Sequence, residues 1–191
     1  MESIVQAKRV LEIFKEMSQI PRESGNEKGI SDYIVNFAKN LGLEVHQDDQ
    51  YNVVIKKPAS PGYENRPSII LQGHIDMVCV RDHDSNHDFT KDPIANIIEG
   101  EWMHADHTTL GADNGMGGAM MLAILEDDSQ QHGPMQLLFT TNEETGMDGA
   151  FAIKEGQVSG DYLLNLDTEV EHDFTVSCAG GCHVHVNIPL L

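Results

Sequence analysis

Three short apolar segments constrain the fold of this chain more than any other feature of its sequence. Residues 68–72, 135–140 and 161–165 are each of strand length, and each contains a continuous apolar run. Such runs are typical of strands that are buried on both faces of a sheet. The three segments therefore predict the centre of a sheet.

Helical patterns alternate with these segments. One helix is expected before Pro21, with Val5, Val10, Leu11, Phe14 and Met17 at helical spacing. A second follows Asn26 as a plausible N-cap and ends at Gly42. The glycine-rich residues 111–118 lead into a helix at 119–126, and a short helix is expected near residues 149–154.

Further strand patterns complete the organisation. Two short strands are expected at 43–47 and 52–57, and a hairpin that turns at Gly100 joins 94–99 to 101–105. Strands interleaved with helices predict an α/β fold, with a mixed, mostly parallel sheet flanked by helices.

Metal-binding side chains stand where the three apolar segments end. In open α/β sheets ligands bind beyond the carboxyl ends of the strands, so these side chains are expected to converge. One imidazole with several carboxylates suits zinc, manganese or cobalt. Two like charges ~4 Å apart repel by about 4 kcal/mol at an effective dielectric near 20, so a dinuclear metal site would stabilise the cluster. The candidates are His74, Asp76, Asp113, Glu143, Glu144 and Asp167.

The charge of the chain argues against two classes of partner. There are 31 acidic and 12 basic residues, which give a formal net charge of −19. Nucleic acids and anionic membranes both bind basic surfaces, so neither is expected as a partner. The charged N-terminal segment is unlike a signal peptide, and three unpaired cysteines are typical of a reduced compartment. The sequence therefore predicts a cytoplasmic protein.

Four segments carry a family resemblance. GHIDMV, TTLGADNG, TNEETGMDGA and LNLDTE resemble the signature segments of the zinc-dependent exopeptidases, which include aminoacylases, carboxypeptidase G-type enzymes and dipeptidases. HDFTKDP, GEWMHA and CAGG resemble more specifically the bacterial Xaa-His dipeptidases. The resemblance extends to Gly181 and implies the zinc-exopeptidase catalytic domain.

The resemblance implies four metal ligands. His74 and Asp167 would bind one ion, Glu144 would bind the other, and Asp113 would bridge the two. Because three protein ligands serve the His74 ion and two serve the other, one divalent ion is expected to bind markedly more tightly than the second. Zinc is the expected metal, with cobalt or manganese as alternatives.

The resemblance also implies two residues that act without binding metal. Asp76 would accept a hydrogen bond from the His74 imidazole and fix its tautomer. Glu143 would be the general base, which takes a proton from the water activated by the metals and passes it to the leaving amine. Residues 145–146 are expected to supply the turn that lets adjacent Glu143 and Glu144 face one site.

The chain also departs from the family pattern. Members of the family run further and supply a lid domain and a late histidine ligand. Residues 1–181 are therefore interpreted as the N-terminal part of the catalytic domain, and 182–191 as the start of a strand that leads toward the lid. His107 is interpreted as a loop residue, and His183 and His185 as structural or solvent-facing.

The expected function is metal-dependent hydrolysis of dipeptides, with Xaa-His (carnosine-like) dipeptides as the favoured substrate. The alternatives are a related tripeptidase, an N-acyl-amino-acid deacylase, or a truncated copy that binds metal without turnover. A chain of this length is expected to have weak activity, and a homodimer is considered for the full-length protein.

Overall fold

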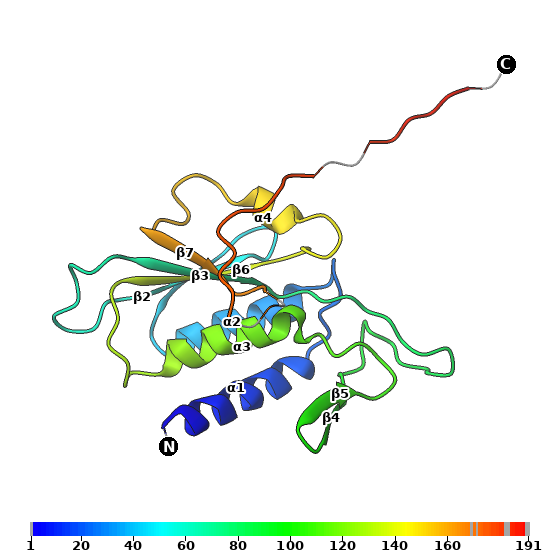
Figure 1. Cartoon of the computed structure of the whole chain (residues 1–191), viewed down its shortest axis with the longest axis horizontal. Coiled ribbons are helices and arrows are strands. Elements are labelled where there is room, and N and C mark those ends of the chain that lie inside the picture. Colours follow the sequence, from blue (N-terminus) through cyan, green and yellow to red (C-terminus); the bar gives the residue numbers. More distant parts are fainter. Residues whose placement is uncertain (1, 169, 171, 182–183, 190–191) are drawn as a thin grey trace.

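The computed structural model describes residues 2–168, 170, 172–181 and 184–189. Its helices and strands follow one another in an alternating order along the chain (Figure 1). The described elements are α1 (Glu2–Ser18), α2 (Lys28–Asn40), β1 (Glu44–Gln47), β2 (Val53–Lys57), β3 (Ile69–His74), β4 (Asn96–Glu99), β5 (Trp102–Ala105), α3 (Ala112–Glu126), β6 (Met135–Thr140), α4 (Asp148–Ala152) and β7 (Tyr162–Asn165).

Five of the described strands form one mixed sheet, in the order β1-β2-β6-β3-β7. Strand β3 pairs in parallel with both β6 and β7, whereas β2 is antiparallel to β1 and to β6. The remaining strands, β4 and β5, form a separate hairpin. The predicted α/β class and mixed sheet are confirmed, but the parallel and antiparallel pairings of the described strands in this sheet are equal in number, so the sheet is not mostly parallel. The strands of the candidate site belong to its parallel part.

The main core lies between the sheet and three helices. Helices α2 and α3 pack on the sheet, and α1 packs against α3. Figure 1 shows these helices on one side of the sheet and α4 on the other. Neighbouring residues of β3 serve the two faces: Leu71 joins the core under the helices, and Ile70 joins a smaller apolar cluster on the α4 side. This alternation follows from the period of two in a strand.

Two element boundaries differ from the sequence prediction. Helix α2 begins at Lys28, with Glu27 rather than Asn26 as its N-cap. Helix α3 begins at Ala112 and includes most of the glycine-rich segment, although Asp113 and Asn114 have non-helical backbone angles. Buried glycines let this helix approach its neighbours: a Cβ on Gly118 would lie 3.1 Å from the Met17 Cε atom.

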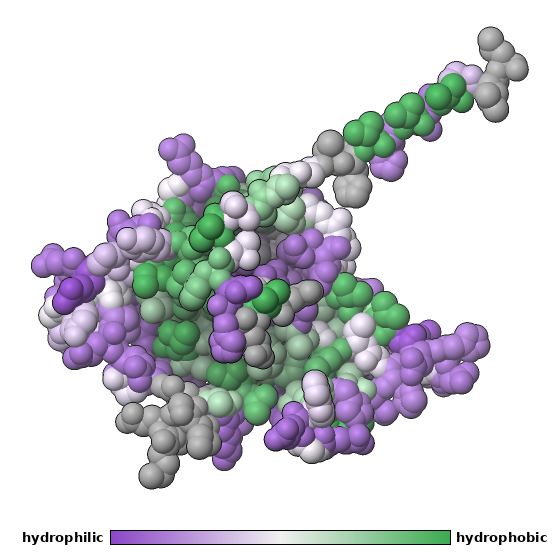
Figure 2. Space-filling model, viewed as in Figure 1, coloured by the Kyte–Doolittle hydropathy of each residue, from purple (hydrophilic) through white to green (hydrophobic). Residues whose placement is uncertain are grey.

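The prediction of a buried strand at 161–165 is wrong for the described residues. Strand β7 is at the end of the sheet order, and all four of its side chains are exposed. Apolar residues are visible around β7 in the space-filling view (Figure 2). An apolar run in the sequence shows that a segment is hydrophobic, but it does not specify which elements of the fold cover that segment. The prediction of burial was wrong for this reason.

The prediction for 182–191 falls partly outside the described residues, because 182, 183, 190 and 191 are not among them. Residues 184–189 are described and are assigned to no strand. Figure 1 shows them extending away from the sheet. None of the described helices is both long enough and apolar enough to cross a membrane.

Lys57 connects the sheet to the end of α3, and this contact gives a stability prediction. Its buried ammonium donates to the carbonyl oxygens of Ile124 (3.0 Å), Leu125 (2.9 Å) and Asp127 (2.9 Å). Lys57→Met leaves these acceptors without their cation, so we expect the free energy of unfolding to fall by about 1–3 kcal/mol in chemical denaturation. Lys56→Met is the matched control: Lys56 is exposed and pairs with exposed Glu44, a contact worth about 0–1 kcal/mol. An equal decrease in the free energy of unfolding of the two variants would contradict the prediction.

Candidate metal centre

The candidate site lies at the edge where the parallel strands end. Because β6, β3 and β7 run in the same direction, their carboxyl ends lie side by side. His74 is the last residue of β3, Glu143 and Glu144 follow β6, and Asp167 follows β7. Asp113 reaches the same edge from the start of α3. The convergence predicted from the sequence is therefore present.

His74 is at the centre of this group. It is 1% exposed, and its Nε2 atom lies 3.1 Å from Oδ1 of Asp113, 3.8 Å from Oδ2 of Asp167 and 4.0 Å from Oε2 of Glu143. Its other ring nitrogen, Nδ1, lies 3.2 Å from Oδ1 of Asp76. The imidazole thus presents one nitrogen to the cluster and the other to a carboxylate behind it.

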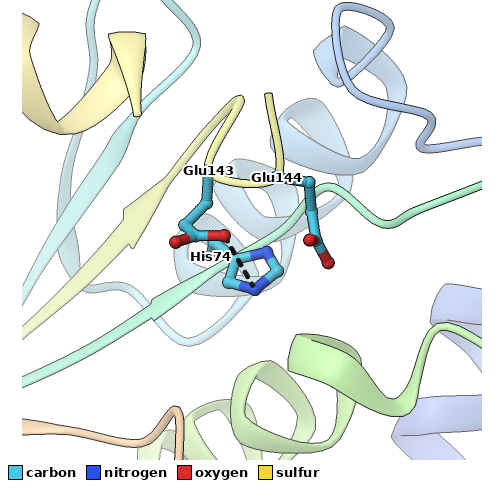
Figure 3. Close-up of side chains that lie close together, drawn as sticks. All are labelled: His74, Glu143 and Glu144. Atoms are coloured by element: carbon cyan, nitrogen blue, oxygen red, sulfur yellow. Dashed lines mark ion pairs between the residues drawn. The ribbon is translucent and has the colours of Figure 1, made fainter. Parts of the chain in front are cut away.

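The described residues form two overlapping groups that could hold metal ions. One contains His74, Asp113 and Asp167, and the other contains His74, Glu143 and Glu144; within each group the potential ligand atoms lie within 4.8 Å of one another. Figure 3 shows the carboxylates of Glu143 and Glu144 on either side of the His74 ring. The first group contains the three residues that the sequence assigns to one ion.

Asp76 connects His74 to the loop that carries Glu143 and Glu144. Its carboxylate is fully buried and accepts hydrogen bonds from the backbone N–H groups of Glu143 (3.1 Å) and Glu144 (3.3 Å). It also accepts from the Ser24 hydroxyl at 2.8 Å. Burial alone would raise the pKa of Asp76, but the bonds from His74, Ser24 and Glu143 outweigh it and lower that pKa. The carboxylate therefore stays ionised beside the imidazole.

Residues 145–146 lie within the turn that places both glutamates at the site, as the sequence predicts. Asn142 and Met147 adopt the left-handed conformation, with φ of 54° and 58°, and the Met147 N–H donates to the Asn142 carbonyl at 2.7 Å. Gly146 within this turn has no positive φ, so the left-handed residues flank the segment predicted at 145–146. Asparagine tolerates this conformation better than most residues, which is consistent with its place just before Glu143.

The backbone that presents Asp113 also has an unusual geometry. Gly111, the N-cap residue of α3, has a φ of 70°, a conformation that glycine adopts at little cost. The peptide bond between Asp113 and Asn114 is cis. Regular helix begins only after Asn114, because Asp113 and Asn114 have non-helical backbone angles.

The electrostatics of the site favour a cation. Burial and then the charge of Asp113 raise the pKa of Glu144, and burial also raises the pKa of Asp167. Burial opposes protonation of His74, yet the neighbouring carboxylates, Asp76 first, raise its pKa to about 9. Converging carboxylates that repel one another around one imidazole are a donor set that fits zinc, so the chain's residues fit a bound divalent metal.

The other histidines considered from the sequence lie elsewhere. His107 is exposed, and its Nδ1 atom lies 2.7 Å from Asp82 on a neighbouring loop. It belongs to neither metal-competent group among the described residues. His183 lies outside the described residues, and His185 is exposed on the extended segment 184–189.

Sequence reasoning missed three residues behind the site. The sequence analysis assigns no role to Arg22, Ser24 or Glu27, yet each contacts a segment that carries a candidate ligand. A buried arginine and glutamate in a short connection leave no periodic signal. The one available signal in the sequence was Arg22, a charged residue that directly follows the helix-ending Pro21.

The chain is similar to several known proteins. Residues 70–187 match the peptidase family M20/M25/M40. The chain is 46% identical over 179 residues to the cytosol non-specific dipeptidase of Escherichia coli (strain K12), covering 94% of this chain and 37% of that protein. The crystal structure of aminoacylhistidine dipeptidase from Vibrio alginolyticus matches with a TM-score of 0.83 and 47% identity, over 85% of this chain and 33% of that one.

A tripeptidase structure from Staphylococcus aureus is also similar. It matches with a TM-score of 0.72 and 26% identity, over 85% of this chain and 44% of that one. The chain thus spans between about a third and under a half of the length of these three relatives.

Proposed function

The chain belongs to the peptidase family M20/M25/M40, and we propose that it provides the metal centre of a dipeptidase. The observation that carries this proposal is the convergence on His74. A single buried imidazole nitrogen lies within 4.0 Å of carboxylate oxygens from Asp113, Asp167 and Glu143, which come from separate segments of the chain. A hydrolase that activates water with metals needs such a set of donors.

We assign the metal ligands as the sequence predicts them. His74 and Asp167 would hold one divalent ion, Glu144 would hold the second, and Asp113 would serve both. Zinc suits this set best, and cobalt or manganese would also fit. The two ions, when bound, would lower the pKa of the attacking water and polarise the scissile carbonyl.

Two further side chains have proposed roles: Glu143 transfers a proton, and Asp76 orients the His74 ring. Glu143 is the general base: its carboxylate is partly exposed and lies beside the His74 nitrogen that faces the cluster. It accepts the proton of the attacking water and donates it to the leaving amine. Asp76 acts behind the imidazole, where its bond with Nδ1 fixes the tautomer and leaves Nε2 free to bind metal.

The proposed substrates are dipeptides, with Xaa-His peptides among them. Two relatives of nearly equal identity have names that differ on this point, since one is called non-specific and the other aminoacylhistidine dipeptidase. A tripeptidase is the second candidate, because of the S. aureus structure. We propose a cytoplasmic location, in line with the name of the E. coli relative.

A substrate panel tests this function. The intact protein, loaded with zinc or cobalt, is given β-alanyl-histidine and other Xaa-His dipeptides, dipeptides without histidine, tripeptides and N-acetyl amino acids, and amine release is measured. We expect turnover of dipeptides above tripeptides and acetyl amino acids, and no turnover after chelation. Preference for tripeptides or acetyl amino acids would overturn the substrate assignment. Metal binding without any turnover would identify a copy that binds metal only.

A further inference from the structure

Residues 22–27, which belong to the connection between α1 and α2, lie directly behind the candidate metal centre. It pairs with the segment after β3: Glu23 forms a parallel bridge with Met77, and the Met77 N–H donates to the Arg22 carbonyl at 3.1 Å. The connection is therefore held against the backbone that follows His74 and Asp76, far from it in the sequence.

Arg22 joins two ligand-bearing segments. Its side chain is buried, and Nη1 donates to the carbonyl oxygens of Ile75 and Asp76, each at 3.2 Å. Nη2 donates to the carbonyl of Gly111, two residues before Asp113. The spacing between the end of β3 and the start of α3 is thus fixed by one planar guanidinium, whose donors have a rigid geometry.

Glycines make room for this guanidinium. A Cβ on Gly115 would lie 2.6 Å from Nη2 of Arg22, and a Cβ on Gly111 would meet the same atom even more closely. The start of α3 therefore approaches Arg22 in a way that only glycine permits.

Ser24 and Glu27 contact the remaining segments. The Ser24 hydroxyl donates to Oδ2 of Asp76 at 2.8 Å. The buried Glu27 carboxylate accepts from the Asn142 N–H at 3.0 Å, just before Glu143, and from the Gly25 N–H at 2.8 Å. Glu27 thereby ties the start of the Glu143–Glu144 turn to its own connection.

We propose that residues 22–27 are the positioning segment of the metal centre. Arg22 sets the distance between the His74 and Asp113 segments, Ser24 orients the Asp76 carboxylate behind His74, and Glu27 holds the turn that carries Glu143 and Glu144. None of the three side chains is a metal ligand or a catalytic group. The inference rests on the proposed metal centre, but not on the proposed substrate.

Cobalt binding to Ser24 variants tests this inference. The purified protein and its Ser24→Ala, Ser24→Thr and Asn26→Ala variants are titrated with Co²⁺, and the visible absorption band is recorded at each step. Separately, thermal unfolding of each metal-free protein reports stability. Asn26 is the matched control because it is an exposed residue of the same connection.

We expect Ser24→Ala to weaken Co²⁺ binding by about 10-fold and to change the absorption band, because loss of a partner behind a ligand typically costs about 10–100-fold in affinity. Its metal-free melting temperature should fall by several degrees at most, because only one hydrogen bond to a carboxylate is lost. Ser24→Thr retains the hydroxyl and should restore binding, and Asn26→Ala should bind as the parent does.

Three outcomes would overturn the proposal. An unchanged Co²⁺ affinity and an unchanged absorption spectrum in Ser24→Ala would overturn the positioning role of Ser24. That result would leave the proposed metal centre unaffected. A large fall in metal-free stability with an unchanged spectrum would assign Ser24 a structural role only. Absence of Co²⁺ binding by the parent would remove the metal centre itself, and the proposed function with it.

A second pair of variants applies the same test to Glu27. Glu27→Gln retains an acceptor oxygen for the Asn142 N–H, whereas Glu27→Ala removes it. We expect the alanine variant to show weaker Co²⁺ binding and the glutamine variant to bind as the parent does. Equal binding by both variants and the parent would remove Glu27 from the positioning segment.

Discussion

Glu143→Gln is expected to lower kcat for dipeptide hydrolysis by about 10²–10⁴-fold, the range that a positioned general base contributes. The amide has nearly the shape of the carboxylate but cannot accept the proton of the attacking water. Because His74, Asp113, Asp167 and Glu144 are unchanged, the metal content should remain that of the parent. Steady-state kinetics on a dipeptide and metal analysis of the same preparation measure the two effects.

The neighbouring glutamate is the matched control for this prediction. Glu144→Gln makes the same chemical change one residue further along the same turn, but at a proposed ligand. We expect this variant to lose metal as well as activity. If Glu143→Gln also loses its metal, or if it hydrolyses dipeptides as fast as the parent, Glu143 is not the general base.

Asp113→Asn should have little effect on stability without metal and a large effect with it. In the metal-free protein the Asp113 charge raises the pKa values of Glu144 and Asp167, so removing it relieves repulsion. The change also weakens the contact at 3.1 Å between Asp113 Oδ1 and His74 Nε2, so the metal-free variant should be about as stable as the parent. With zinc the variant should be less stable than the parent, because the proposed bridging carboxylate is lost.

Thermal unfolding of both proteins with and without zinc measures this difference. A ligand present at 100 times its Kd stabilises the folded state by about 2.7 kcal/mol. For a chain of this size that corresponds to a rise in Tm of about 5–10 °C in the parent protein. The Asp113→Asn variant should lose most of the rise. A zinc-dependent rise as large as that of the parent would show that Asp113 does not bridge the metals.

The positions of the candidate ligands could be predicted because they follow from chain direction. Apolar runs before His74, Glu143 and Asp167 indicate strands, and parallel strands bring their ends together. The side chains at those ends then converge although they are distant in the sequence. The positions of these ligands therefore depend only on the apolar pattern of each strand and on the rule that the carboxyl ends of parallel strands lie at the same edge of the sheet.

Two features of the fold could not be predicted in the same way. The glycine-rich start of α3 reads as a loop because glycine has low helix propensity. Its place in the helix is decided by close packing, as a Cβ on Gly117 would lie 2.8 Å from the Leu166 carbonyl oxygen. The exposure of β7 likewise depends on neighbours that no local pattern specifies.

The positioning segment is the clearest case of a site feature hidden from sequence reasoning. Arg22, Ser24 and Glu27 have no periodicity that marks them, and their partners lie in distant segments. A polar residue in a helix connection is usually solvated, so only the folded arrangement distinguishes these three. Long-range hydrogen bonds of buried polar groups are fixed by tertiary packing and not by local propensity.

The four donors that meet on the Asp76 carboxylate have an evolutionary consequence. Groups that share one acceptor do not contribute independently, so the cost of changing one depends on which of the others is present. Mutational paths through this cluster are therefore epistatic. A substitution at Ser24 that is harmless in one background can be disabling in another, and the order in which such changes accumulate decides which sequences remain accessible.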